Sequence, residues 1–279
     1  SSDLARAAFA ASAAGSLAPS DIGGARKHYD AYNRAMLARA LQLHPVEIAE
    51  QTIRDVQVHL VTPCGGATDR RVLICLHGGG FMWGAGAGAL LEAAPVAAIT
   101  GMQVIAVDYR LAPENPFPAA VEDVLAVYTQ LLTRADASCI GIYGCSAGGM
   151  LAAQAVARIA SEGIQPPGAI AMLHGTGLEF AGDSASTASA FDLRAAPGGV
   201  PTAAELPYFA MANLHDPLVL PGDHPSVLAQ FPPSLLVSGT RDFAASACSV
   251  MHRRLLAAGT ESRFVLFDGL WHAHHMDAT

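Results

Sequence analysis

Charged side chains are scarce in this chain: they make up 14% of its 279 residues and leave a net charge of −8. Lysine and arginine form no cluster, which argues against nucleic acid or an anionic membrane surface as a partner. Hydrophobic residues reach 52%, yet no uninterrupted apolar run approaches the length of a membrane span. We therefore expect no stable membrane insertion.

Signals for export are also missing. The first residues, Ser1–Arg6, lack the basic-then-apolar order of a signal peptide, although the absence of an initial Met leaves room for a removed leader. The five cysteines are widely spaced, odd in number and without a CxxC pair. This usage indicates reduced thiols and a cytoplasmic location.

Two cofactor signatures are absent as well. The glycines of 84–88 lack the spacing of a dinucleotide fingerprint and are interpreted as a turn before a helix. The run His272–His275 could suggest a metal site, but no HExxH or comparable carboxylate spacing accompanies it. We therefore expect no metal.

From residue 71 onward, apolar runs alternate with helical patterns, which indicates an α/β fold with a mostly parallel central sheet and helices on both faces. The expected strands are 71–76, 102–107, 139–143, 168–173, 233–238 and 263–267. The expected helices are 87–99, 118–132, 146–161 and 244–258. Before them, helices are expected at 3–18 and 26–43 and a strand at 52–61.

The stretch 177–230 breaks this rhythm, which suggests a cap over the carboxyl edge of the sheet or, alternatively, a loose surface loop. Its apolar content favours ordered packing, through Leu178, Phe180, Phe191, Leu206, Tyr208, Phe209 and Met211. We divide the chain into an N-terminal helical cap segment (1–48), a core (49–176 and 226–279) and a cap insertion (177–225).

The clearest chemical motif is Gly144-Cys145-Ser146-Ala147-Gly148, placed between a strand and a helix. Such a sharp turn presents a serine at the sheet edge, and the glycines allow strand and helix to approach closely. Chance matches occur in a chain with 27 glycines, but the position after a strand makes chance less plausible. We predict Ser146 as a nucleophile.

A second glycine-rich turn, His77–Gly80, follows the strand at 71–76. Backbone N–H groups without side chains in the way can face a forming oxyanion. We predict Gly79, Gly80 and Ala147 as its donors, and His77 as a residue that orients the loop. An ordinary flexible loop is the alternative.

The base and acid are predicted from chain order, which runs Ser, acid, His in this arrangement. His272 follows the last predicted strand, whereas His274 and His275 are expected at the surface or against the cap. Asp242 follows the penultimate strand and would hold the imidazole, or else cap the helix at 244–258. Two weaker acid candidates lie in the irregular stretch: Asp216 and Asp223.

A third block, Asp108–Glu114, follows the strand at 102–107. Its charges could look catalytic, but its place on a neighbouring loop favours a scaffold. We expect ion pairs among Asp108, Arg110 and Glu114 to brace the oxyanion loop.

Together, His77–Phe81, Asp108–Glu114 with Pro118–Asp123, and Gly144–Gly149 resemble the hormone-sensitive-lipase-like family of bacterial carboxylesterases, over residues 50 to 279 by motif order. The resemblance implies an α/β-hydrolase fold with a helical cap, no cofactor, and hydrolysis of short- to medium-chain acyl esters. It implies Ser146, Asp242 and His272 as the catalytic triad, with an ester as small-molecule partner.

The chain departs from this family at two places. Cys145 stands where members usually carry Asp, which puts the hydrogen bonding behind the nucleophile in question. Members also usually close with a helix after the catalytic His, whereas this chain has seven residues after His272.

Other expectations rest on position alone. A substrate pocket is predicted from Phe81, Trp83, Phe209 and Trp271. A homodimer is possible through the edge strand at 263–267. An acyltransferase or amidase with the same triad stays open, and so does a non-catalytic binding protein on this fold, although His272 stands in place.

Overall fold

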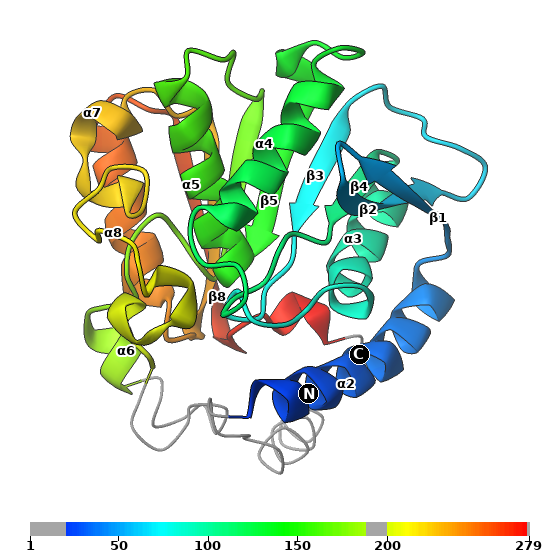
Figure 1. Cartoon of the computed structure of the whole chain (residues 1–279), viewed down its shortest axis with the longest axis horizontal. Coiled ribbons are helices and arrows are strands. Elements are labelled where there is room, and N and C mark those ends of the chain that lie inside the picture. Colours follow the sequence, from blue (N-terminus) through cyan, green and yellow to red (C-terminus); the bar gives the residue numbers. More distant parts are fainter. Residues whose placement is uncertain (1–20, 188–199, 278–279) are drawn as a thin grey trace.

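The centre of the molecule is one eight-stranded sheet (Figure 1), seen in a computed structural model that describes residues 21–187 and 200–277. The strand order is β1-β2-β4-β3-β5-β6-β7-β8. The antiparallel pairs are β1 with β2 and β2 with β4, and the other pairs are parallel. The strands are β1 (Val46–Ile53), β2 (Val56–Pro63), β3 (Val72–Leu76), β4 (Gln103–Val107), β5 (Ile140–Cys145), β6 (Ala169–Leu173), β7 (Ser234–Arg241) and β8 (Ser262–Trp271).

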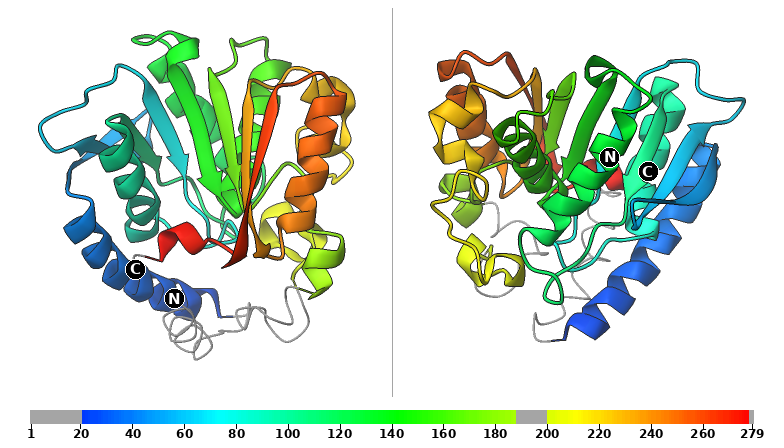
Figure 2. Two further views of the ribbon diagram at one scale, coloured as in Figure 1. Left: turned by 180° about the vertical axis from the view of Figure 1, so that it is seen from behind. Right: turned by 45° about the horizontal axis from the view of Figure 1, so that its top comes forward.

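Helices cover both faces of this sheet, because the parallel strands need crossover connections. Figure 1 shows α4 and α5 in front of the sheet, and the left view of Figure 2 shows α3 on the opposite face. The long helices of the core are α3 (Ala87–Thr100), α4 (Ala119–Leu131), α5 (Ala147–Ser161) and α8 (Ala245–Ala257). The predicted α/β fold and mostly parallel sheet are confirmed.

The prediction of a single strand at 52–61 is wrong. The chain turns there in a hairpin, since Ile53 pairs directly with Val56 and the turn residues Arg54 and Asp55 have φ of 47° and 69°. Two left-handed residues in a two-residue loop form the turn that matches strand twist. Apolar residues recur on both sides of the turn, so the periodicity alone did not reveal it.

The N-terminal part of the described chain is helix α2 (Ile22–Leu43), which lies along α3 (Figure 2). It begins four residues earlier than predicted because the Asp21 carboxylate accepts the N–H of Gly24 at 2.8 Å and caps the helix. The helix predicted at 3–18 lies outside the described residues.

The irregular stretch after β6 is built of short turns: α6 (Asp183–Thr187), η3 (Ala203–Glu205), η4 (Pro207–Phe209), η5 (Pro221–Asp223) and α7 (Pro225–Leu228). Four of its predicted core residues are buried, namely Leu178, Leu206, Tyr208 and Phe209, and Phe180 is half-buried. Met211 is 84% exposed, so its prediction is wrong; Phe191 lies outside the described residues. The described part of this stretch is ordered rather than a loose loop.

Strand β8 forms one edge of the sheet, as expected for a pairing surface. Its Leu266 and Phe267 are exposed, and dimerisation there stays a prediction. Across residues 21–187 and 200–277, none of the helices combines the length and the apolar character needed to cross a bilayer.

Candidate active site

Five functional side chains each come directly after the end of a strand: His77 after β3, Ser146 after β5, His174 after β6, Asp242 after β7 and His272 after β8. Parallel strands end at the same edge of the sheet, so these side chains gather there. Figure 1 shows the C-terminal turn η6 (His274–Met276, red) at this edge, below the tip of β3.

Ser146 stands on a strained turn between β5 and α5, with φ of 56° and ψ of −119°. The turn is possible because glycines flank it. A Cβ on Gly144 would lie 2.5 Å from the carbonyl oxygen of Leu76, and a Cβ on Gly148 would lie 1.8 Å from the same oxygen. The close approach of β3, β5 and α5 therefore excludes any side chain at either position.

We expect Gly148→Ala to destabilise the protein strongly, because the new methyl group would overlap the backbone of Leu76. The unfolding free energy should fall by about 3 kcal/mol or more, as measured by denaturant unfolding. Gly23→Ala is the control, since its Cβ would meet only Asp21 Oδ1 at 3.9 Å. Equal stability of the two variants would contradict the packing described here.

The nucleophile, base and acid predicted from the sequence are brought together. Ser146 Oγ lies 2.9 Å from His272 Nε2, and His272 Nδ1 lies 2.7 Å from Asp242 Oδ1. An ionised carboxylate can only accept, so Nδ1 carries the proton and Nε2 is free to accept from the serine hydroxyl.

The Asp242 carboxylate is fully buried and accepts four hydrogen bonds. Besides His272, the donors are Ala244 N (2.9 Å) on Oδ1, and His174 Nδ1 and Ser238 Oγ (both 2.6 Å) on Oδ2. Burial by itself would raise the pKa of Asp242, but the electrostatic interaction with His272 and the hydrogen bonds from His174 and His272 outweigh it and lower the pKa. Asp242 is thus ionised at neutral pH, and its bond to Ala244 N also supports the start of α8.

Two neighbours of this pair were missed by the sequence analysis. His174 is buried, and this burial lowers its pKa to about 4 although Asp242 acts in the opposite direction, so it is a neutral donor to that carboxylate. Phe243 stacks on the His272 ring with centroids 4.0 Å apart. A signal for His174 existed, because it directly follows the predicted strand at 168–173.

The glycine-rich loop after β3, predicted to hold an oxyanion, adopts backbone conformations that favour glycine. Gly79 and Gly80 have φ of 114° and 59°, and a Cβ on Gly79 would lie 2.2 Å from the oxygen of Trp83. Within the described part of the chain, the N–H groups of Gly79, Gly80 and Ala147 donate to no protein acceptor. They are therefore available to an external oxygen.

His77, the first residue of this loop, is held in place by Tyr109 and by the loop backbone. Its buried ring stacks on Tyr109 with centroids 4.2 Å apart, and its Nδ1 lies 2.8 Å from the oxygen of Gly78. The Tyr109 hydroxyl donates to the oxygen of His77 at 2.7 Å. These contacts fit an orienting residue.

The expected ion pairs among Asp108, Arg110 and Glu114 are not formed. Asp108 contacts His59 Nε2 at 3.0 Å and accepts the N–H of Gly86 at 2.8 Å. Arg110 instead pairs with Asp123 at 2.9 Å and with Glu122 at 3.0 Å. Each charge has a partner from another segment, which sequence proximity could not reveal.

Glu114 pairs with Arg26 of α2 at 2.7 Å. The same guanidinium donates to the carbonyl oxygens of Met82 (2.8 Å) and Ala112 (2.9 Å). Arg26 therefore ties α2 to the end of the oxyanion loop and to the block after β4.

The four predicted pocket residues differ in their packing. Phe81 and Phe209 are core residues, and Phe81 stacks on Tyr208 at 3.8 Å. Trp83 and Trp271 keep exposed surface. A substrate pocket lined by these residues stays a prediction.

The remaining candidates have other roles. Asp216 accepts the N–H of Leu218, and Asp223 pairs with Arg254, so neither contacts His272. His274 and His275 pack against His174, with ring centroids 4.9 Å and 5.5 Å apart. His275 is exposed, in agreement with the expected surface position, and His274 is half-buried.

The chain after His272 continues as the single turn η6. Trp271 Nε1 donates to Asp277 Oδ2 at 2.8 Å across this turn. Cys145 behind the nucleophile is buried, and burial raises the pKa of its thiol. The side chain directly behind the nucleophile is thus a neutral thiol and not a carboxylate.

A serine on a strand-to-helix turn, beside an imidazole and a buried carboxylate at the edge of a parallel sheet, is the arrangement of an α/β hydrolase. The α/β-hydrolase-fold family matches residues 73–276, and the chain belongs to this family. The predicted resemblance to hormone-sensitive-lipase-like esterases is confirmed by this family match and by the solved structures described next.

Individual relatives agree with this assignment. The chain is 30% identical to an acetyl-hydrolase of Streptomyces hygroscopicus over 74% of its length and 69% of that protein. It is similar to the solved structure of an esterase from the bacterial hormone-sensitive lipase family, with a TM-score of 0.77, 27% identity, and coverage of 95% of this chain and 93% of that one. A hormone-sensitive lipase from a metagenome library gives a TM-score of 0.80 at 25% identity, covering 96% and 89% of the two chains. Two other curated relatives match over 40% and 42% of their own length.

Proposed function

We propose that the protein is a carboxylic ester hydrolase that cleaves short- to medium-chain acyl esters through an acyl-enzyme. Ser146 is the nucleophile, His272 the general base and acid, and Asp242 the carboxylate that orients the imidazole. The observation that carries this proposal is the 2.9 Å contact of Ser146 Oγ with His272 Nε2, whose other nitrogen contacts the buried Asp242. The esterase and acetyl-hydrolase names of the relatives support the reaction class.

In the first half of the reaction, His272 takes the proton of Ser146 as Oγ attacks the ester carbonyl carbon. The N–H groups of Gly79, Gly80 and Ala147 stabilise the oxyanion, which is the step where fixed donors contribute most. His272 then gives its proton to the leaving alcohol, and the acyl group stays on Ser146. In the second half, water attacks the acyl carbon, His272 takes its proton and returns it to Ser146, and the acid departs.

We further propose that residues 1–48 and 177–225 cap the carboxyl edge and close a pocket lined by Trp83 and Trp271. Two contacts support this proposal. Tyr29 of α2 stacks on Trp83 with centroids 4.7 Å apart. Ser184 of α6 donates to the oxygen of Phe243 at 2.8 Å, next to the ring that stacks on His272.

The test is a series of p-nitrophenyl esters from acetate to dodecanoate, together with the matching p-nitroanilides, with and without added methanol. We expect kcat/KM to be highest between acetate and octanoate and much lower on the anilides. Dominant methyl-ester products would instead indicate an acyltransferase, and comparable anilide cleavage an amidase. Failure to label with a fluorophosphonate would indicate a non-catalytic binding protein.

A further inference from the structure

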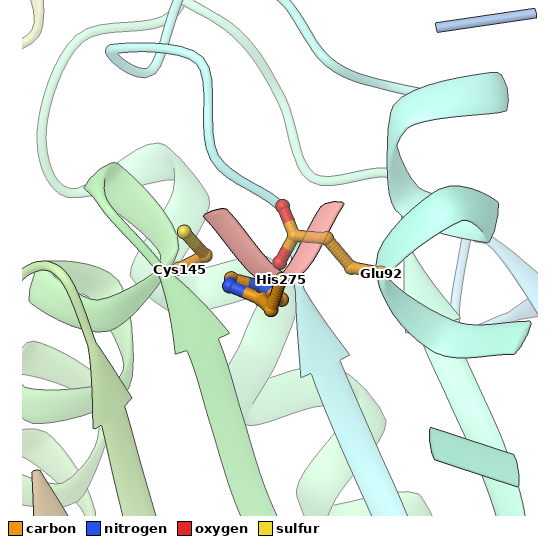
Figure 3. A group of neighbouring side chains, drawn as sticks. All are labelled: Glu92, Cys145 and His275. Carbon is orange, nitrogen blue, oxygen red and sulfur yellow. The ribbon is translucent and has the colours of Figure 1, made fainter. Parts of the chain in front are cut away.

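Glu92 is the one charged residue of the otherwise apolar helix α3, and it is 3% exposed. Figure 3 shows its side chain reaching from α3 toward Cys145 and His275. Its Oε1 accepts the backbone N–H of Gly78 at 2.7 Å. A helix on one face of the sheet thereby holds the first glycine of the oxyanion loop.

Gly78 sits where this loop passes the nucleophile. A Cβ built on Gly78 would lie 3.1 Å from the oxygen of Cys145, 3.4 Å from Ser146 Cβ and 3.6 Å from Glu92 Oε1. The donors Gly79 and Gly80 follow directly. The Glu92 bond therefore fixes the loop immediately before the groups that face the oxyanion.

Among the residues that the structure describes, no side chain facing Glu92 carries a positive charge that would neutralise an ionised carboxylate. The titratable side chains that face it are Cys75, Tyr109, Tyr143, Cys145 and His275, from four different elements or loops. Burial raises the pKa of each of the thiols and phenols, which are neutral. Within the described residues, Glu92 forms no ion pair with lysine, arginine or histidine.

The histidine next to Glu92 is neutral as well. His275 keeps exposed surface as a residue, but its ring lies between Glu92 and Cys145 (Figure 3). Desolvation and the neighbouring imidazoles of His174, His274 and His272 lower its pKa well below the usual value.

The surroundings of the second carboxyl oxygen also indicate that Glu92 is protonated and neutral. Oε2 is buried and has no hydrogen-bond partner among the residues that the structure describes. A carboxyl oxygen of Glu92, the Cys145 thiol and a ring nitrogen of His275 all lie within 4.8 Å of one another. The thiol is a weak acceptor and the neutral imidazole an uncharged one for the hydroxyl of a protonated Glu92. Burial raises the pKa of Glu92 to about 8, and the hydrogen bond from the Gly78 N–H offsets only part of that rise.

We propose that Glu92 is a positioning residue that holds the oxyanion loop as a neutral carboxylic acid, and that its ionisation weakens catalysis at alkaline pH. The catalytic part rests on the proposed esterase function. A charge on Glu92 would lie close to the site where the oxyanion forms, and the two negative charges would repel each other in a water-poor region.

The first test compares kcat and KM of wild type, Glu92→Gln and Glu92→Leu on p-nitrophenyl butyrate between pH 6 and pH 9.5. Leu removes the acceptor of the Gly78 N–H, so kcat should fall about tenfold at every pH with little change in KM. Gln keeps an acceptor and cannot ionise, so it should restore most of this loss. Of these three proteins, only wild type should lose kcat as the pH rises through about 8, by about tenfold relative to Glu92→Gln. Glu47→Gln on exposed β1 is the control and should follow wild type.

The second test needs no catalysis. A group whose pKa is raised by folding adds stability below its unfolded pKa of about 4.3, and this stability is lost as the pH rises through the folded pKa. The unfolding free energy of wild type minus that of Glu92→Gln should therefore fall between about pH 4.5 and pH 8.5, the window that the pKa of about 8 defines.

The outcomes separate the two proposals. Parallel pH profiles of wild type and Glu92→Gln, in kcat and in stability, would overturn the role of Glu92. Should wild type hydrolyse no ester and resist fluorophosphonate, the esterase function falls, and the stability profile then decides whether Glu92 is neutral. A failure of Glu92→Leu to fold leaves the Gln comparison as the decisive one.

Discussion

Ser146→Ala should lower kcat/KM on p-nitrophenyl esters by about 10⁴-fold or more and abolish labelling by a fluorophosphonate. The substitution removes only the Oγ atom that contacts His272 Nε2 at 2.9 Å. Any residual turnover would come from the oxyanion donors and from substrate binding.

The fold should survive this change. Alanine keeps the Cβ that Ser146 already accommodates at φ of 56°, and the neighbouring glycines still provide the close contacts of the turn. We expect a melting temperature near that of wild type by calorimetry. Ser226→Ala, at an exposed position of α7, is the matched control for activity. Wild-type turnover by Ser146→Ala would mean that the ester is cleaved elsewhere.

Asp242→Asn should lower kcat by about 10⁴-fold, because the amide no longer favours the imidazole tautomer that accepts from Ser146. It should also destabilise the protein, unlike the serine variant. The carboxylate accepts four buried hydrogen bonds, including those from His174 and Ser238 on Oδ2. An amide offers one acceptor oxygen, so buried donors lose their partner and the unfolding free energy falls by about 3 kcal/mol.

The pH dependence of this loss has a definite sign. Folding lowers the pKa of Asp242, so its contribution to stability is fully present above its unfolded pKa of about 3.9 and disappears as the pH falls below it. The stability difference between wild type and Asp242→Asn should therefore be largest near neutral pH and shrink in acid. Asp136→Asn, at an exposed position, should show no such difference. A variant as stable as wild type would contradict the four-donor arrangement.

Much of this molecule could be predicted from sequence because its strands are short, apolar and buried on both faces. The strand expected at 71–76 and the helix expected at 146–161 differ from β3 and α5 by one residue at the start. Ser146, Asp242 and His272 could be predicted because each follows a strand, and parallel topology brings such positions together.

What the sequence did not reveal depends on long-range packing. The turn at Arg54 and Asp55 lacks the glycine or asparagine that usually marks left-handed residues. The partners of Glu114 and Glu92, namely Arg26 and the Gly78 N–H, lie in segments far away in the chain. Only the folded arrangement of α2, α3 and the loops decides such pairings.

The guanidinium of Arg26 links helix α2 to the loop that carries the proposed oxyanion donors, so α2 can influence the reaction rate. It donates to the carbonyl oxygens of Met82 and Ala112. In the described part of the chain, it forms no hydrogen bond with Ser146 or His272. Substitutions along α2 that move Arg26 should therefore shift the oxyanion donors without changing the contacts among Ser146, His272 and Asp242. For laboratory evolution, α2 is thus a segment, remote from the proton-transfer groups, in which substitutions should change the turnover rate.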